Sequence, residues 1–202
     1  MKKNLLALAV LCAMTSGAAF AQQADGPWLV RARAVQLSSA NQGSLGSGSA
    51  LDLSINDKVI PEVDVSYFFT PNWAAELVLT VPQRHDVRSG GTAIGTLKHL
   101  PPTLMAQYHF TGWGRFTPYV GAGINYTRFS SVNILNGGAT LDSHSWGGAL
   151  QLGVDIPVGR NLYLNLDVKK VLIRTDVAVG GAKAGDFKVD PVLFGVGLGY
   201  RF

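Results

Sequence analysis

Cysteine is nearly absent from the chain, because Cys12 is the single one among 202 residues. It lies in the N-terminal segment, so disulfide bonds are not expected to hold the fold together. Charge is also sparse, since Asp, Glu, Lys and Arg make up 15% of the residues. No cluster of five lysines and arginines occurs, although a surface that binds nucleic-acid phosphates normally has one. These absences argue against a nucleic-acid partner.

Long apolar runs are missing as well once the first 21 residues are set aside. No stretch of 18 apolar residues follows them, which excludes a helical membrane span. Helical periodicity is hard to find, whereas glycine is abundant, with 24 residues. A single all-β domain is therefore the economical interpretation for a chain of this length.

The N-terminal segment Met1–Ala21 has the features of an export signal peptide. Lys2 and Lys3 precede an apolar run, and small residues end the segment. Cys12 follows a leucine and not the small residue that a lipoprotein cleavage site needs, so a lipid anchor is not expected. We predict cleavage after this segment, with residues 22–202 forming one domain outside the cytoplasm.

Strict period-two alternation marks the last strand, residues 192–202. One face carries large apolar residues and the other carries small or charged ones: Val192, Phe194, Val196, Leu198, Tyr200 and Phe202 against Gly195, Gly197, Gly199 and Arg201. A soluble edge strand rarely has such faces, whereas a barrel wall in lipid does, because large groups meet the acyl chains. The chain ends on an aromatic residue, as many bacterial outer-membrane barrels do. We therefore expect Tyr200 and Phe202 to act as a membrane-insertion signal for the outer-membrane insertion machinery. A strand of a soluble β-sandwich is the alternative.

The same alternation predicts eight strands, at residues 28–37, 61–69, 73–81, 103–110, 118–128, 146–156, 162–169 and 192–202. Long loops are expected at 38–59, 82–102, 129–143 and 175–189, with a short strand extension compatible with residues 51–55. Short turns follow the second, fourth and sixth strands. The sequence thus predicts an all-β fold, an eight-stranded antiparallel transmembrane β-barrel.

The alternation of short turns and long loops also predicts which end faces which side. In outer-membrane barrels the short turns face the periplasm and the long loops face outside. Both termini then lie on the periplasmic side. Aromatic residues gather near the strand ends at that side, where an interfacial girdle is expected: Trp28, Tyr67, Phe69, Trp73, Phe110, Tyr200 and Phe202.

The inward face carries charges of both signs. An arginine on the lipid face would cost about 2–4 kcal/mol at the midplane, so these groups are expected to point into the lumen. They are Arg31, Arg33, Lys169 and Arg201 against Glu62, Asp64, Glu76, Asp155 and Asp167. Unpaired charges in a narrow lumen are costly, so the near-balance predicts an ion-paired plug. An eight-stranded barrel also leaves no wide aqueous pore.

Inward positions nearer the outer rim are less polar. The apolar ones proposed to form a lumen or gate are Val35, Leu37, Val78, Met105 and Leu193. An apolar funnel above a polar floor could admit a small hydrophobic solute and deflect it sideways between strands into the lipid. The alternative is that these side chains only fill the barrel.

Several segments resemble the outer membrane protein W (OmpW) family of Gram-negative bacteria, in order over nearly the whole mature chain. They are Lys98-His-Leu-Pro-Pro-Thr-Leu-Met-Ala-Gln107, Pro118-Tyr-Val-Gly-Ala-Gly-Ile-Asn-Tyr-Thr127, Ser145-Trp-Gly147, and Asp190-Pro191 with the terminal Gly199-Tyr-Arg-Phe202. The resemblance implies a barrel in outer-membrane lipid and lipopolysaccharide, with a narrow hydrophobic lumen through which small hydrophobic compounds cross the outer leaflet. It places Val78 where the family narrows this channel. Lys169 stands where an apolar or aromatic residue is expected.

Other chemistries find little support. Asp142, Ser143 and His144 are adjacent, but neighbours on a strand point to opposite faces, so no catalytic triad and no enzyme are expected. His85, Asp86 and His99 show no recurring metal-ligand spacing. The glycine-rich runs do not open a helix, so no nucleotide cofactor is expected. A barrel whose extracellular loops bind a partner, without transport, remains the second functional hypothesis.

Overall fold

The computed structural model describes residues 26–39, 42–45, 53–89, 92–134, 138–179 and 182–202. The expected signal peptide, residues 1–21, lies outside the described residues, and so do residues 51 and 52 of the expected strand extension. Within the described ranges no helix is long and apolar enough to cross a membrane.

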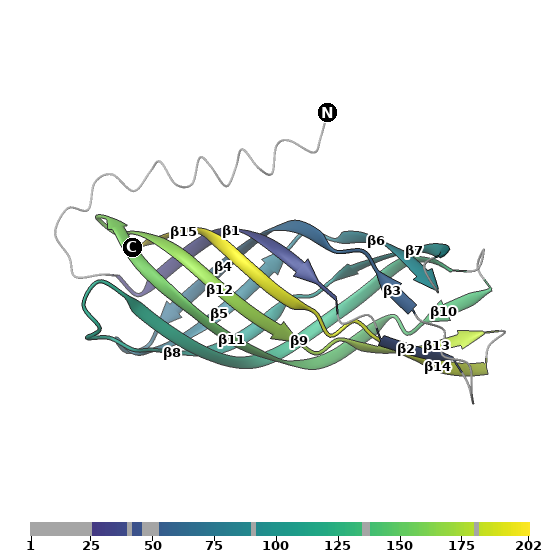
Figure 1. The fold of residues 1–202 in the computed structure, drawn as a ribbon. Coiled ribbons are helices and arrows are strands. Elements are labelled where there is room, and N and C mark those ends of the chain that lie inside the picture. Colours follow the sequence, from purple (N-terminus) through teal and green to yellow (C-terminus); the bar gives the residue numbers. More distant parts are fainter. Residues whose placement is uncertain (1–25, 40–41, 46–52, 90–91, 135–137, 180–181) are drawn as a thin grey trace.

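Eight antiparallel strands close into a barrel (Figure 1). In chain order they are β1 (Trp28–Ser38), β4 (Lys58–Phe68), β5 (Trp73–Thr80), β8 (Thr103–His109), β9 (Thr117–Ile134), β11 (His144–Gly159), β12 (Leu162–Val171) and β15 (Val192–Arg201). Each strand pairs with the next around the ring, and β15 pairs with β1 to close it. The predicted eight-stranded barrel is confirmed.

Period-two alternation decides which side chains face out. On β11, for example, Leu150 and Leu152 are exposed while Ala149 and Gln151 are buried. Large exposed apolar side chains of β5, β8, β9, β12 and β15 continue this belt: Leu77, Leu79, Leu104, Val120, Ile124, Leu166, Val168, Phe194, Val196 and Leu198. A closed barrel leaves no unpaired strand edge, so such a belt can meet hydrocarbon without exposing backbone polar groups.

Seven further strands of the described residues extend the wall beyond the barrel at the end opposite the C-terminus (Figure 1). They are β2 (Gln42–Leu45), β3 (Leu53–Ile55), β6 (Gln83–Ser89), β7 (Thr92–Leu100), β10 (Ala139–Leu141), β13 (Arg174–Val179) and β14 (Ala182–Lys188). We call this part the extension. β6 pairs with β3 and β7, and β7 with β9, while β10, β13, β14 and β2 pair in that order.

The extension corrects the expectation of four long loops. The alternation does not stop at the barrel rim, since His85 and Val87 of β6 are buried while Arg84, Asp86 and Arg88 are exposed. Backbone N–H and C=O groups need partners, and pairing between neighbouring segments provides them. The described residues of the loops expected at 38–59, 82–102, 129–143 and 175–189 are therefore largely strands.

Glycine is required where two backbones approach closely. A Cβ on Gly197 would lie 2.0 Å from the carbonyl oxygen of Ala32 on the adjacent β1. In the turn before β9, Gly112 and Gly114 have φ angles of 95° and 72°, in the left-handed region that glycine adopts without strain. Gly112 and Gly114 thus allow the turn before β9, and Gly197 allows β15 to approach β1 closely enough to close the barrel.

Candidate functional site

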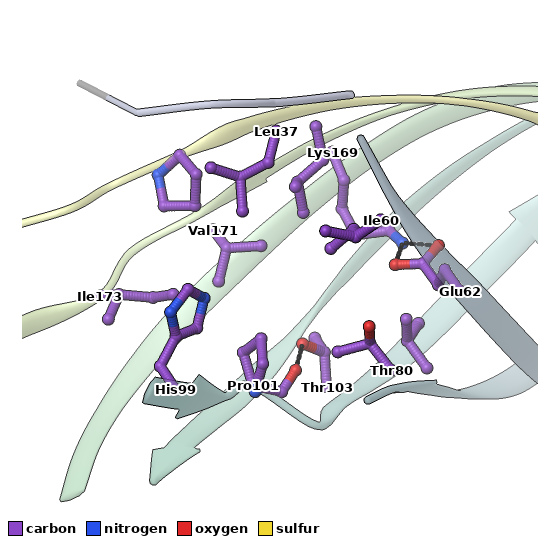
Figure 2. Close-up of a pocket in the computed structure, with 13 residues that line it drawn as sticks. Leu37, Ile60, Glu62, Thr80, His99, Pro101, Thr103, Lys169, Val171 and Ile173 are labelled. Carbon is purple, nitrogen blue, oxygen red and sulfur yellow. Dashed lines mark hydrogen bonds and ion pairs between the residues drawn. The ribbon is translucent and has the colours of Figure 1, made fainter. Parts of the chain in front are cut away.

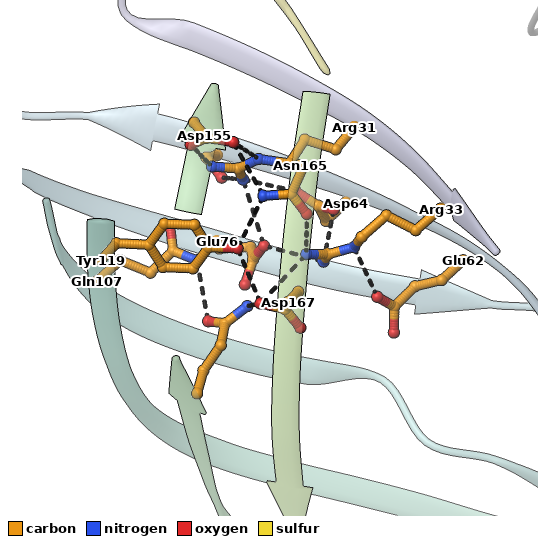
Figure 3. Close-up of polar contacts among 12 residues, drawn as sticks. Arg31, Arg33, Glu62, Asp64, Glu76, Gln107, Tyr119, Asp155, Asn165 and Asp167 are labelled. Atoms are coloured by element: carbon orange, nitrogen blue, oxygen red, sulfur yellow. Dashed lines mark hydrogen bonds and ion pairs between the residues drawn. The ribbon is translucent and has the colours of Figure 1, made fainter. Parts of the chain in front are cut away.

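A buried ion-pair cluster, which we call the plug, occupies the middle of the lumen (Figure 3). Arg31 binds Asp155 with two nitrogens, as Nε donates to Oδ1 at 3.1 Å and Nη2 donates to Oδ2 at 2.7 Å. Its Nη1 donates to Asp64 Oδ1 and to Ser66 Oγ, both at 3.0 Å. One guanidinium thus links β1, β4 and β11 across the lumen.

The second arginine of β1 and the lysine of β12 extend the plug toward the extension. Arg33 Nη2 lies 2.6 Å from Asp64 Oδ2 and 3.2 Å from Glu76 Oε1. Its Nε lies 3.0 Å from Glu62 Oε1. Lys169 Nζ donates to both oxygens of the same Glu62, at 3.0 and 3.2 Å. Lys169, which departs from the expected apolar residue, is therefore neutralised by a partner on β4.

Neutral polar side chains complete the plug. Tyr119 Oη donates to Asp167 Oδ2 at 2.8 Å, and Gln151 Nε2 donates to the same oxygen at 2.8 Å. Asn165 Nδ2 donates to Asp155 Oδ1 at 2.9 Å and to Tyr119 Oη at 3.0 Å. These bonds add neutral donors to carboxylate oxygens that the arginines also contact, since Asp155 Oδ1 accepts from Arg31 and Asp167 Oδ2 lies 3.4 Å from Arg33 Nη1. A buried charged cluster needs such additional hydrogen bonds.

The glycine face of β15 gives the two arginines room. A Cβ on Gly199 would lie 3.0 Å from Arg31 Cγ, and one on Gly195 would lie 3.3 Å from Arg33 Cδ. Larger residues would crowd the aliphatic stems of both arginines. The glycines on the inner face of β15 are thus explained by the arginine side chains that pack against them.

Arg201 lies apart from the plug, which differs from the expectation. Its Nε donates to the Gly26 carbonyl at 2.8 Å, and its guanidinium carbon lies 4.0 Å from the centre of the Phe68 ring. The side chain is half-buried at the rim near the termini. Its contacts join β15 to residue 26, where the described chain begins, and to Phe68 of β4, and do not add a cation to the lumen cluster.

A mostly apolar cavity lies between the plug and the extension (Figure 2). Leu37, Val78 and Leu193 line it, while Val35 and Met105 belong to the same buried apolar cluster without lining the cavity. Its free volume is about 20 Å³, room for about one water molecule. In this conformation the lumen is closed, so a larger solute needs side chains to move aside.

Several residues of the cavity wall were not among those proposed for the apolar lumen. Besides Glu62 and Lys169 of the plug, the wall contains Ile60, Thr80, His99, Pro101, Thr103, Val171, Ile173 and Pro191. Continuing the alternation of β4 by one residue and that of β12 by two would have placed Ile60 and Val171 on the inner face. His99 was not assigned to an inner face because residues 82–102 were expected to form a loop.

Two buried histidines stack where the cavity meets the extension. The rings of His85 and His99 lie 4.8 Å apart with an interplanar angle of 22°. His85 Nδ1 lies 3.2 Å from the Asn56 carbonyl oxygen, whereas the Nε2 atoms of both rings have no hydrogen-bond partner among the described residues. Burial, reinforced by the neighbouring His85, lowers the pKa of His99 to about 3, and burial also lowers the pKa of His85. Both rings are therefore neutral at physiological pH.

One interval of the wall beside the cavity lacks ladder pairing. The register between β5 and β8 ends at Val78 opposite Thr103, and that between β6 and β7 begins at Gln83 opposite His99. In the described chain, no ladder pairing joins 79–82 to 100–102, and we call this interval the seam. Proline has no N–H to donate, and Pro82, Pro101 and Pro102 fall in the seam.

Comparison with known proteins assigns the family. The model of the OmpW family matches residues 24–202. The chain belongs to the OmpW family. It is 36% identical to outer membrane protein W of Escherichia coli over 215 residues, with all of both chains covered. It is 28% identical to the dibenzothiophene metabolism operon protein PahQ of Pseudomonas aeruginosa over 162 residues, which cover 77% of this chain and 76% of that one.

A solved structure supports the same architecture for this OmpW-family chain. The outer membrane protein OprG from Pseudomonas aeruginosa superposes with a TM-score of 0.76 at 25% identity, covering 88% of this chain and 97% of that one. The family and the closed barrel together place the protein in the outer membrane.

Aromatic side chains mark both edges of the apolar belt of this OmpW-family barrel. Near the termini, the Trp28 and Tyr67 rings lie 4.8 Å apart. Toward the extension, the Tyr126 and Trp146 rings lie 4.8 Å apart, and Trp146 is 66% exposed. Amphipathic rings favour the membrane interface, so the two groups delimit the membrane-spanning part.

The two aromatic residues expected to form an insertion signal lie at the termini end. Tyr200 and Phe202 are both exposed, with ring centres 6.2 Å apart. The Phe202 backbone pairs with Trp28, as each N–H donates to the other's carbonyl at 2.9 and 3.1 Å. They therefore lie on the outer face where β15 closes onto β1.

The polar residues considered for catalysis and those considered for metal binding lie in different places, since Ser143 contacts His144 whereas His85 stacks on His99. Ser143 Oγ lies 3.1 Å from His144 Nδ1, a contact that the expectation of opposite faces did not foresee, and both side chains are exposed. Ser145 is buried, and its Oγ accepts a hydrogen bond from the Arg174 backbone at 3.2 Å. In the part of the chain that the structure describes, no three His, Cys, Asp or Glu residues form a group that could hold a metal ion.

Proposed function

We propose that this OmpW-family protein gives small hydrophobic molecules a narrow path across the outer leaflet of the outer membrane, with release sideways into the lipid. The observation that carries the proposal is the apolar cavity resting on a closed charged floor. An apolar solute that enters from the extension would have to separate buried ion pairs to continue through the plug, and a buried charge left without its partner is costly. A sideways exit avoids that cost.

The seam supports the sideways exit. Thr80, Pro101 and Thr103 line the cavity and lie in or beside the seam. Separating paired strands would break ladder hydrogen bonds in a medium that offers no replacement. At the seam few such bonds exist, so this interval can widen at lower cost than the rest of the wall.

The name of a relative supports an apolar solute. PahQ is named for a dibenzothiophene metabolism operon, and dibenzothiophene is a hydrophobic aromatic compound. The cavity of this chain has a matching chemical character, since most of its lining residues are apolar. The solute class proposed is therefore small and predominantly hydrophobic.

The orientation belongs to the same proposal. The extension faces the outside, where lipopolysaccharide is the surrounding lipid, and both termini face the periplasm. Residues 1–21 serve as a cleaved signal peptide, and Tyr200 and Phe202 guide insertion by the outer-membrane machinery. The short turns at the termini end and the aromatic edges of the belt support this orientation.

The test is entry of an apolar dye into vesicles whose outer leaflet is lipopolysaccharide, because plain phospholipid is itself permeable to such molecules. Val78 is 4% exposed and lines the cavity, so Val78→Arg should block entry by placing a bulky cation in it. Val158→Arg, at an exposed site near the turn end of β11, is the matched control for added charge. Equal entry with and without the wild-type protein would remove the proposal. Wild-type entry in a folded Val78→Arg variant would show that Val78 does not line the path.

A further inference from the structure

Among the side chains of the described cavity wall, His99 alone has a fully buried polar atom without a hydrogen-bond partner. Its Nε2 is unpaired although the residue is only 2% exposed, and Figure 2 shows its ring beside Ile173 and Pro101, facing the apolar side chains. A buried group without a hydrogen bond is destabilising. A ligand that supplied the missing bond would recover that free energy on binding.

The other polar side chains of the cavity wall are already satisfied. Thr80 Oγ1 donates to the Pro61 carbonyl at 2.9 Å, and Thr103 Oγ1 donates to the Pro101 carbonyl at 3.2 Å. At the far end of the cavity Lys169 is held by both oxygens of Glu62. Recognition of a polar group on a solute therefore falls to His99.

The character of His99 selects the kind of polar group. Because burial holds its pKa near 3, the imidazole is neutral and can donate or accept one hydrogen bond. A carboxylate would need a free cation to offset its desolvation, and Lys169 is already paired with Glu62. A hydroxyl suits His99 in either tautomer, because it both donates and accepts.

We infer that His99 recognises a single uncharged hydrogen-bonding group on the passing solute, so that small apolar alcohols and phenols are preferred over the parent hydrocarbons and over carboxylates. The inference rests on the proposed path. It adds a specificity-determining residue and a narrower solute class.

The experiment compares three fluorescent probes that share one ring system: naphthalene, 2-naphthol and 2-naphthoate. Protein-dependent entry is measured in the lipopolysaccharide vesicles after the rate in protein-free vesicles is subtracted. For the wild type we expect 2-naphthol to enter fastest. His99→Phe keeps an aromatic ring against His85 without a polar nitrogen, and should lower the ratio of naphthol to naphthalene entry by about three- to tenfold, the size of one hydrogen bond.

Two further variants separate recognition from packing. His99→Gln restores a donor and an acceptor, and should recover part of the ratio if His99 acts by hydrogen bonding. His144→Phe is the matched control, because His144 is exposed and lies outside the cavity wall. Folding of each variant is checked by its heat-dependent mobility in gels. If His99→Phe fails to fold, His99→Gln and His99→Asn carry the comparison, since their different reach should give different ratios.

The outcomes distinguish the inference from the proposed function. No protein-dependent entry of any probe would overturn both. Entry of naphthalene and 2-naphthol with the same ratio in the wild type and the folded His99 variants would overturn the inference and leave the path intact. Entry of 2-naphthoate as fast as 2-naphthol would overturn the preference for an uncharged group.

Discussion

Removing Arg31 tests whether the plug holds the barrel together. Arg31 is fully buried and makes two bonds to Asp155 and one to Asp64. Arg31→Met preserves much of the side-chain volume but leaves Asp155 without its arginine, whereas Asp64 keeps Arg33. Breaking a buried ion pair by removing one partner costs about 3–5 kcal/mol. We therefore expect the free energy of unfolding to fall by about that amount.

The assay is unfolding by urea in detergent micelles, followed by tryptophan fluorescence. The double variant Arg31→Met/Asp155→Asn removes the stranded charge as well, so it should be more stable than Arg31→Met alone, and a double-mutant cycle measures the coupling. Arg115→Met, at an exposed turn near the termini, is the control for the loss of an arginine. Arg31→Met with wild-type stability, or a double variant no better than the single one, would refute the argument that paired charges support the wall.

Three further predictions concern the wall and the histidines. Leu152→Arg, on the lipid face, should weaken membrane insertion by about 2–4 kcal/mol, measured as the folded fraction in vesicles; normal insertion would contradict the assigned face. Gly153→Val should destabilise the barrel, because a Cβ there would lie 2.3 Å from the Tyr119 ring, and an unchanged unfolding midpoint would exclude this contact. The folded-state pKa of His99 is below that of the unfolded chain, so the unfolded state binds more protons and stability falls as pH drops below about 6.5. Between pH 7.5 and 5, His99 should lower the free energy of unfolding of the wild type by about 2 kcal/mol. The His99→Phe variant should not show this contribution.

The barrel could be predicted from the sequence because a period of two assigns each residue to a face. On β1 the pattern placed Arg31 and Arg33 inside, and both are buried. The extension was missed because polar residues occupy both faces of its strands. On β6, buried His85 alternates with Arg84 and Asp86, so hydrophobicity alone does not reveal the strand. To tell buried polar residues from exposed ones, it is necessary to know which strands lie alongside.

The partners inside the lumen were harder to predict than the faces. Charge balance suggested ion pairs, but it did not show that Lys169 would meet Glu62 or that Arg201 would bind near the chain ends. The partner that each charged side chain contacts depends on how strands far apart in the sequence align across the lumen. The unpaired Nε2 of His99 had no sequence signal at all, because satisfaction of a polar atom depends on surrounding atoms.

The pairing of β15 with β1 has a consequence for biogenesis. The backbone of Phe202 bonds to Trp28, and β15 pairs with β1 along its whole length, so the cylinder is sealed by two strands at opposite ends of the described chain. Contacts between segments so far apart in the sequence carry a large loop-closure entropy, so sealing is expected to be a slow step of folding. Removal of β15 would leave β1 and β12 without a neighbour on one side.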